Sequence, residues 1–242
     1  MIQDFIIQED GDILRITLNR PDSGNAVSDE MAGELADLLN VKARDFRLVA
    51  LRGQGPDFCV GRASGRPRAA APEALERRRS TEVIFKCYGA FRETPVPVVG
   101  LVQGRALGFG CSLAALCDVT IATEEATFQI PEMSHGTMPT MVMSSLLDRL
   151  SRKAISHLVY TSAAISAQRA LSFGIVSDIV GADQAQAYFE ETCASILRAP
   201  APATLGVKEY LRTAMDMDVR GAVDYARNIH ATINSSSEMK RK

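Results

Sequence analysis

The sequence contains no tryptophan, and aromatic residues make up only 6% of its 242 positions. Its five cysteines are odd in number and form no C-x-x-C pair, so we expect reduced thiols in a cytoplasmic protein rather than a disulfide framework. No apolar run reaches about 18 residues, which argues against a membrane-spanning helix. The first residues also lack the basic-then-apolar pattern of a secretory signal.

A strong charge of either sign is missing too. The net charge is −2, with 46% hydrophobic and 23% charged residues, which is typical of an ordinary globular enzyme or binding protein. Such a balance gives no field that would draw the chain to nucleic acid or to an anionic membrane, so neither is an expected partner. The length suits one large core, which we place at residues 1–180, followed by a helical region at 181–242.

Motifs of several common enzyme classes are absent. Gly108 and Gly110 follow a strand-like run, but the third glycine of a dinucleotide fingerprint is replaced by Leu113. No G-x-S-x-G turn presents a nucleophilic serine. No H-E-x-x-H motif or Cys/His cluster predicts a metal site.

The elements that are present alternate between strands and helices in an α/β pattern. Three stretches share a turn-then-helix order, which suggests repeated ββα units followed by helices. Glu9-Asp10-Gly11-Asp12 lies between two β-like runs and predicts a hairpin. We expect strands at 5–8, 13–18, 48–51, 98–102, 118–122, 126–129 and 175–180, and helices at 28–40, 76–91, 109–116, 166–174, 183–197, 203–215 and 219–234.

Two glycine-containing segments each follow a predicted strand: Phe58-Cys59-Val60-Gly61-Arg62 and the run from Gly104 to Cys111. The second leads directly into an apolar helix, so its first N–H groups lack intrahelical partners. Two backbone donors aimed at one point would form an oxyanion hole, which stabilises negative charge on a carbonyl oxygen. The pair therefore predicts acyl chemistry.

These segments resemble the crotonase superfamily, the enoyl-CoA hydratase/isomerase family. Further similarity follows in order along the chain: Asn19-Arg20-Pro21, Cys117-Asp118, Phe128-Gln129-Ile130-Pro131-Glu132, and the stretch 165–176. The resemblance implies a crotonase-like spiral of ββα units that binds an acyl-CoA thioester, with coenzyme A as part of the substrate and no separate cofactor. It also implies a homotrimer or a dimer of trimers, with the C-terminal helices serving oligomerisation and covering the active site.

By position in these motifs, the oxyanion donors are the amides of Arg62 and Phe109, and Glu132 is the catalytic acid/base. Hydratases of the family usually carry a second glutamate where this sequence has Ser112. One carboxylate that removes a proton and returns it elsewhere is the pattern of a Δ3-Δ2-enoyl-CoA isomerase, which we therefore favour. The alternatives are a hydratase/dehydratase that uses Glu132 alone, and a crotonase-fold scaffold without catalysis.

Substrate contacts are predicted around the same motifs, although some residues depart from the family pattern. Phe109 stands where glycine is common, so its ring must point away from the thioester. The chain ends at Lys242, short of a common CoA-contacting tail, which shifts phosphate binding to arginines that could equally form a solvated surface. His135 could line the pocket or be a surface residue. The predicted substrate- and CoA-binding residues are Ala63, Ser64, Arg66, Arg68, Gly108, Ser112 and His135.

Overall fold

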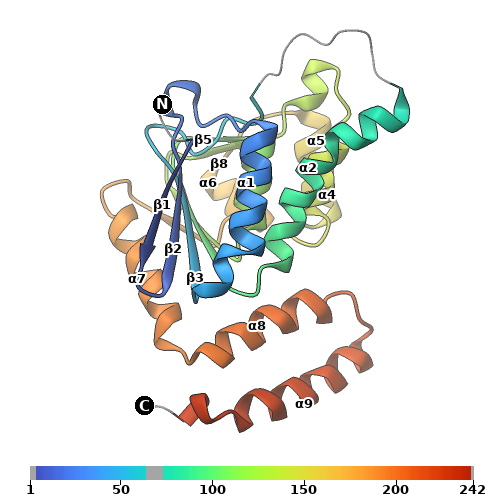
Figure 1. Cartoon of the computed structure of the whole chain (residues 1–242). Coiled ribbons are helices and arrows are strands. Elements are labelled where there is room, and N and C mark those ends of the chain that lie inside the picture. Colours follow the sequence, from blue (N-terminus) through green and yellow to red (C-terminus); the bar gives the residue numbers. More distant parts are fainter. Residues whose placement is uncertain (1–3, 64–72, 241–242) are drawn as a thin grey trace.

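A six-stranded sheet and a small three-stranded sheet organise the fold, with helices on both faces of the larger sheet (Figure 1). The computed structural model describes residues 4–63 and 73–240. The larger sheet has the order β1 (Phe5–Asp10), β2 (Ile13–Leu18), β3 (Leu48–Gly53), β4 (Val98–Val102), β6 (Val119–Thr123) and β9 (Asp178–Val180). The smaller has the order β5 (Arg105–Leu107), β7 (Thr127–Gln129) and β8 (Ile165–Ser166).

The large sheet is parallel except for the β1–β2 hairpin. Its inner strands β3 and β4 are buried along almost their whole length, as expected for parallel strands covered on both faces. The edge strand β1 is mostly exposed after Phe5. The hairpin register brings Asp10 opposite Ile13, so the turn is the two residues Gly11 and Asp12.

Helices form a layer on each face of this sheet. The helices are α1 (Asp29–Asn40), α2 (Ala74–Glu93), α3 (Phe109–Leu116), α4 (Thr140–Leu146), α5 (Arg152–Thr161), α6 (Ala167–Phe173), α7 (Ala185–Arg198), α8 (Ala201–Ala214) and α9 (Val219–Ser235). Side chains of α1, α2 and α3 form the main core with one face of the sheet. Ala185, Phe189 and Cys193 of α7 form a second core with the other face.

The predicted α/β fold of ββα units with C-terminal helices is confirmed, and most predicted elements lie within a few residues of their observed bounds. Ser28 and Ser166 cap α1 and α6 as expected, each accepting a backbone N–H three residues later. The strand β5 was not predicted. The predicted strand at 175–180 is reduced to β9, and the helix predicted at 203–215 starts earlier, because Ala201 and Pro202 begin α8. Proline is compatible with the first turn of a helix.

The last two helices contact each other and lie beyond the sheet (Figure 1). The Lys208 ammonium of α8 is buried and donates to both Asp118 carboxylate oxygens, at 2.8 and 2.6 Å, and to the Phe91 carbonyl. This contact fixes α8 to the core. The boundary between core and helical region at residue 180 stays a prediction. The helix α7, which follows that boundary, packs on the sheet. In the part of the chain that the structure describes, no helix is long and apolar enough to cross a membrane.

Candidate active site

Three short parallel segments end at the same edge of the molecule. Cys59 forms a parallel bridge with Ala106 of β5, and Ala106 pairs with Phe128 of β7. The residues that follow these segments therefore emerge side by side. They are Arg62, Phe109 and Glu132, the three residues that the sequence predicted for catalysis.

Two backbone N–H groups at this edge have no partner among the described residues. In the bridge between Val27 and Arg62, the Val27 N–H donates to Gly61 and the Ala63 N–H donates to Val27. The N–H of Arg62 lies between them and points to the opposite side. Phe109 is the first residue of α3, where an amide has no intrahelical acceptor. Within residues 4–63 and 73–240, neither N–H donates to any acceptor.

Glycine allows the two segments to approach this closely. A Cβ atom on Gly110 would lie 2.0 Å from the Cys59 carbonyl oxygen, so any larger residue would separate α3 from the 58–62 segment. Gly108 has φ 49° and ψ −109°, a conformation open to glycine alone, and a Cβ there would lie 2.6 Å from Oε1 of Glu132. The backbone of the turn and the carboxylate are therefore in direct contact.

Glu132 begins a single turn of 3-10 helix, Glu132–His135, which ends at Gly136 in the left-handed conformation. Its Oε2 atom is buried without a hydrogen-bond partner among the described residues. Burial raises the pKa of the Glu132 carboxyl above its usual range, partly opposed by its own backbone N–H and by His135. A carboxylate that is buried and unpaired is suited to take up a proton.

Glu132 and both free amides line one cavity of about 440 Å³. The Glu132 carboxylate is the single acidic group among the described lining residues, and most of the other walls are apolar. This combination of apolar walls and a few polar groups is typical of a small-molecule site. The cavity is lined by Val60, Gly61, Arg62, Ile84, Tyr88, Gly108, Phe109, Pro131, Glu132, His135, Thr137, Met138, Pro139, Met141 and Val142.

The Phe109 side chain packs against α2. Phe109 is 2% exposed, and its ring stacks on the ring of Tyr88 of α2, with centroids 5.3 Å apart and an angle of 27° between the planes. This contact holds the ring on Tyr88. That the ring leaves the space in front of the Phe109 amide free for a thioester stays a prediction.

The remaining predicted residues have different surroundings. Gly108 and His135 line the cavity, and the His135 side chain is exposed. Ala63 lies just outside the lining, with its N–H bonded to Val27. Ser112 is fully buried and is not among the described residues that line the cavity. Ser64, Arg66 and Arg68 lie outside the described residues.

The Arg62 side chain is held at the rim of the cavity, and its charge is one of the influences that lower the pKa of the lining residue Tyr88. Its guanidinium forms an ion pair with Asp29 at the start of α1, at 2.5 Å, so the main-chain N–H is the part of Arg62 that is free to act. The cysteines are also unsuited to chemistry, since burial raises the pKa of both Cys59 and Cys111 to about 12. No group of three or more metal-ligating side chains occurs among the residues that the structure describes.

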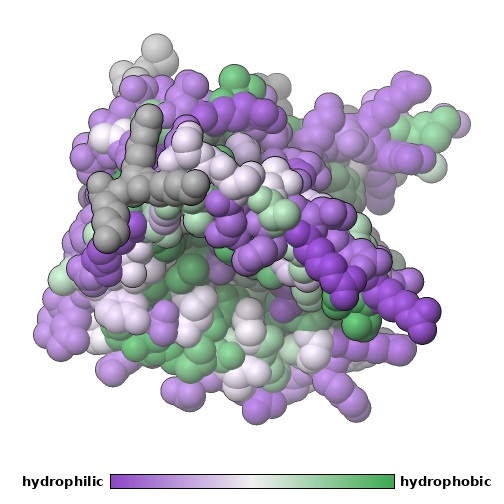
Figure 2. Space-filling model, turned by 90° about the horizontal axis from the view of Figure 1, so that it is seen from below, coloured by the Kyte–Doolittle hydropathy of each residue, from purple (hydrophilic) through white to green (hydrophobic). Residues whose placement is uncertain are grey.

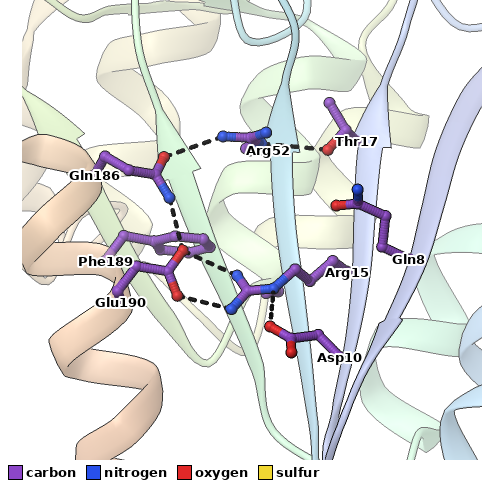
Figure 3. A pocket seen from close by; sticks show the side chains of 9 residues that line it. Gln8, Asp10, Arg15, Thr17, Arg52, Gln186, Phe189 and Glu190 are labelled. Carbon is purple, nitrogen blue, oxygen red and sulfur yellow. Dashed lines mark hydrogen bonds and ion pairs between the residues drawn. The ribbon is translucent and has the colours of Figure 1, made fainter.

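A second cavity, of about 200 Å³, lies between the outer face of the large sheet and α7 (Figure 3). Its polar groups bond to one another. Arg15 donates to Asp10 at 2.9 Å and to both oxygens of Glu190 at 3.0 and 2.7 Å, and Arg52 donates to Gln186 at 3.0 Å. Because these groups are already paired, the second cavity is best explained as a contact that holds α7 to the sheet.

Known proteins share both the sequence and the fold. The profile of the "Enoyl-CoA hydratase/isomerase" family matches residues 8–242. The 2,3-dehydroadipyl-CoA hydratase of Escherichia coli (strain K12) is 27% identical over 98% of this chain and 92% of its own length. The human enoyl-CoA hydratase domain-containing protein 3 is 32% identical over 72% of this chain and 57% of its own length.

Solved structures give the same result. The structure of AtuE from Pseudomonas aeruginosa has a TM-score of 0.90 and 30% identity, covering 98% of this chain and 93% of that one. An enoyl-CoA hydratase from Mycobacterium smegmatis, at 24% identity, shares the fold with a TM-score of 0.91, covering 98% of this chain and 93% of that one. The fold is that of the crotonases. This chain belongs to the enoyl-CoA hydratase/isomerase family.

Proposed function

We propose that this protein is an enoyl-CoA isomerase that moves a double bond from C3–C4 to C2–C3 of an acyl-CoA. The observation that carries the proposal is a cavity at which one buried carboxylate oxygen and two backbone amides have no partner among the described residues. The position that would hold a second carboxylate in a hydratase is the buried Ser112. With one carboxylate, the simplest chemistry is to move one proton.

In this mechanism the Glu132 carboxylate removes a proton from C2 of the 3-enoyl thioester. The electron pair of the C–H bond forms the C1–C2 double bond, and negative charge collects on the thioester oxygen. The N–H groups of Arg62 and Phe109 donate to that oxygen, each contributing about 10² to 10³ in rate. Glu132 then returns the proton to C4, the electrons shift to C2–C3, and the thioester carbonyl re-forms. The product has the same mass as the substrate.

The raised pKa of Glu132 supports this cycle. A carboxyl whose pKa lies nearer neutrality takes a proton from carbon more readily than an exposed glutamate, and it still releases the proton in the next step. The apolar walls keep water from the dienolate. Coenzyme A enters as part of the substrate, so no separate cofactor takes part in any step. The arginines at 66 and 68 remain candidates for its phosphates.

The experiment is to incubate the protein with 3-hexenoyl-CoA, following the absorbance of the conjugated thioester together with the product mass. Conjugation at unchanged mass that is lost in Glu132→Gln supports the isomerase. A parallel reaction with 2-hexenoyl-CoA detects a hydratase, because water adds to the conjugated double bond and gives a product that is heavier by one water. No conversion in either channel removes the isomerase proposal for this acyl group and favours a non-catalytic scaffold.

Hydration is the second candidate, and two observations favour it. The relatives named above include hydratases. In addition, Glu132 and His135 are three residues apart in a 3-10 turn, where side chains at that spacing share a face, and both line the cavity. His135 could then supply the second proton transfer that hydration needs. Replacing His135 by Gln separates the candidates, since only hydration loses rate.

We further propose that copies of this chain assemble into a trimer or a dimer of trimers in the cytoplasm. No residue of α9 is buried, and large apolar side chains on or beside the last two helices are exposed: Leu205, Val207, Leu211, Met215, Met217, Val219 and Val223. Figure 2, seen from below Figure 1, shows apolar side chains gathered in the middle of this face. The cavity-lining residues of one described chain all lie between 60 and 142, so a covering role for 181–242 requires a neighbouring copy. Light scattering after size-exclusion chromatography tests the assembly, and a monomer contradicts it.

A further inference from the structure

Polar side chains end the outer face of the large sheet, which is the face that α7 covers. Because successive side chains of a strand point to opposite faces, residues two apart share one face. Arg52 of β3, Gln103 just after β4 and Thr123 of β6 each follow, by two residues, an apolar side chain of the core that α7 completes. The apolar side chains of these strands in that core are Leu48, Ala50, Val99, Leu101, Val119 and Ile121. The outer face therefore changes from apolar to polar at the carboxyl ends of three neighbouring strands.

These three polar residues line a cleft of about 410 Å³, which we call the edge cleft. It shares no lining residue with the Glu132 cavity. Ligands of open α/β sheets commonly bind in a crevice outside the carboxyl ends of the parallel strands, and the edge cleft has that position. Its other lining residues are Gly53, Pro56, Leu101, Gly104, Glu125, Ala182, Ala185 and Gln186.

Two side chains of the edge cleft have hydrogen-bonding capacity that the fold does not use. Thr123 is 3% exposed, and its Oγ1 atom has no partner within residues 4–63 and 73–240. A buried hydroxyl of this kind costs stability unless a bound group completes its hydrogen bond. Arg52 donates from Nε to Thr17 and from Nη1 to Gln186, which holds its guanidinium between the sheet and α7 (Figure 3). Its Nη2 group donates to no acceptor in the described part of the chain.

The first turn of α7 opens onto the same cleft. Ala185 and Gln186, the first two residues of this 14-residue helix, line it, and the preceding residue Gln184 makes no side-chain cap. The N–H groups of Ala185 and Gln186 have no acceptor among the residues that the structure describes. Such free amides, together with the positive end of the helix dipole, attract a negatively charged oxygen.

We propose that the edge cleft is a second binding site, separate from the Glu132 cavity, for the carboxylate group of a small organic acid. The donors are Nη2 of Arg52, the Thr123 hydroxyl and the first amides of α7, and a carboxylate is an acceptor without protons of its own. The charge favours a single negative charge over the double charge of phosphate. Glu125 is the one acidic side chain in the described lining, and Asp183 precedes α7, so together they offset most of the positive charge.

The test is an NMR titration of the full chain with butyrate at constant ionic strength, following the backbone amide signals of Ala185 and Gln186. Butyrate should shift both signals until they saturate, whereas its neutral analogue butyramide should shift neither. Thr123→Val keeps the shape of the side chain but removes the hydroxyl, and it should weaken butyrate binding about tenfold, the effect of one hydrogen bond to a charged group. Arg52→Gln, which removes the charge, should weaken it at least as much.

Thr94→Val is the matched control, because the Thr94 hydroxyl is also buried without a partner among the described residues but lies outside the edge cleft. It should retain the full affinity for butyrate. Absence of a saturable shift overturns the inference, and so do equal shifts in wild type and Thr123→Val, which would identify an adventitious ion only. Tighter binding of inorganic phosphate than of butyrate overturns the assignment to a carboxylate. None of these outcomes bears on the proposed function, because the titration does not use the Glu132 cavity.

Discussion

The Glu132 cavity and the cavity beside α7 differ in what their polar groups bond to. Around the cavity of Figure 3, Arg15, Arg52, Gln186 and Glu190 bond to one another or to the sheet. At the Glu132 cavity, the amides of Arg62 and Phe109 and one carboxylate oxygen have no partner among the described residues. Paired groups stabilise a fold, whereas buried unpaired groups cost stability and are retained where they bind or react. Function is therefore expected at the Glu132 cavity.

The largest expected effect comes from exchanging one carboxylate for its amide. Glu132→Gln removes the proton acceptor and should lower kcat by about 10³-fold, within the range of general acid–base catalysis. The assay is the formation of conjugated thioester. Glu190→Gln makes the same exchange in the other cavity and should leave kcat unchanged. Equal losses in the two variants would contradict the distinction between the cavities.

Breaking a buried ion pair whose groups bond to each other should lower stability rather than activity. Lys208→Met leaves the Asp118 carboxylate without its cation and should lower the free energy of unfolding by about 3 kcal/mol, measured in urea. Arg212→Met is the matched control on the same helix, since its ion pair with Glu93 is exposed and contributes less than about 1 kcal/mol. A similar small change in both variants would show that Lys208 does not anchor α8.

The turn at Gly108 should be sensitive to a single methyl group. Gly108→Ala places a Cβ atom against Glu132 and imposes an unfavourable backbone conformation, so we expect a loss of about 100-fold in kcat from displacement of the carboxylate. Gly11→Ala is the control: φ is also positive there, but nothing lies within 4 Å of the added atom. It should cost about 1 kcal/mol of stability and no activity. Full activity of Gly108→Ala would contradict the close contact.

The raised pKa of Glu132 predicts a dependence on pH with a definite sign. Its pKa is higher in the folded than in the unfolded chain, so its effect on stability is most favourable when it is protonated and is lost as pH rises above 4.5 through the raised value. Glu132→Gln should therefore be more stable than the wild type at pH 7, and the difference should shrink at pH 5. Unfolding curves at both pH values test this. The rate should fall as pH is lowered through the same window, because the base becomes protonated.

The smallest effect on stability is expected for the solvent-exposed ion pair of Arg15 and Glu190. Glu190→Gln removes the charge opposite Arg15 but keeps a hydrogen-bonding side chain of the same shape. The Glu190 side chain is 41% exposed, so solvent screens the pair and the loss of stability should stay below about 1 kcal/mol. Thermal unfolding at low and high salt measures it. A loss of several kcal/mol would mean that solvent screens the Arg15–Glu190 pair less than the exposure of Glu190 indicates.

The glycine turns and the free amide at the start of α3 could be predicted because each depends on local backbone chemistry, whereas Glu132 was predicted from the resemblance to the crotonase family. The strand β5 could not, since Gly104-Arg105-Ala106 has the composition of a turn and becomes a strand only by pairing with β7. The sequence did not single out Tyr88, because its spacing from Ile84 is equally typical of a core helix face. Ser112 was expected to contact the substrate, but it is fully buried and absent from the described lining, which depends on tertiary packing that the sequence does not reveal.

The central claim is that one carboxylate carries one proton between two carbons. The most direct measurement follows deuterium from C2 of 2,2-dideutero-3-hexenoyl-CoA in ordinary water, with mass spectrometry and NMR of the product. The account predicts a conjugated product of unchanged carbon and oxygen content that keeps part of the transferred deuterium at C4, and no reaction in Glu132→Gln. A product with only hydrogen from water at C4, or one that has gained a water molecule, would contradict it.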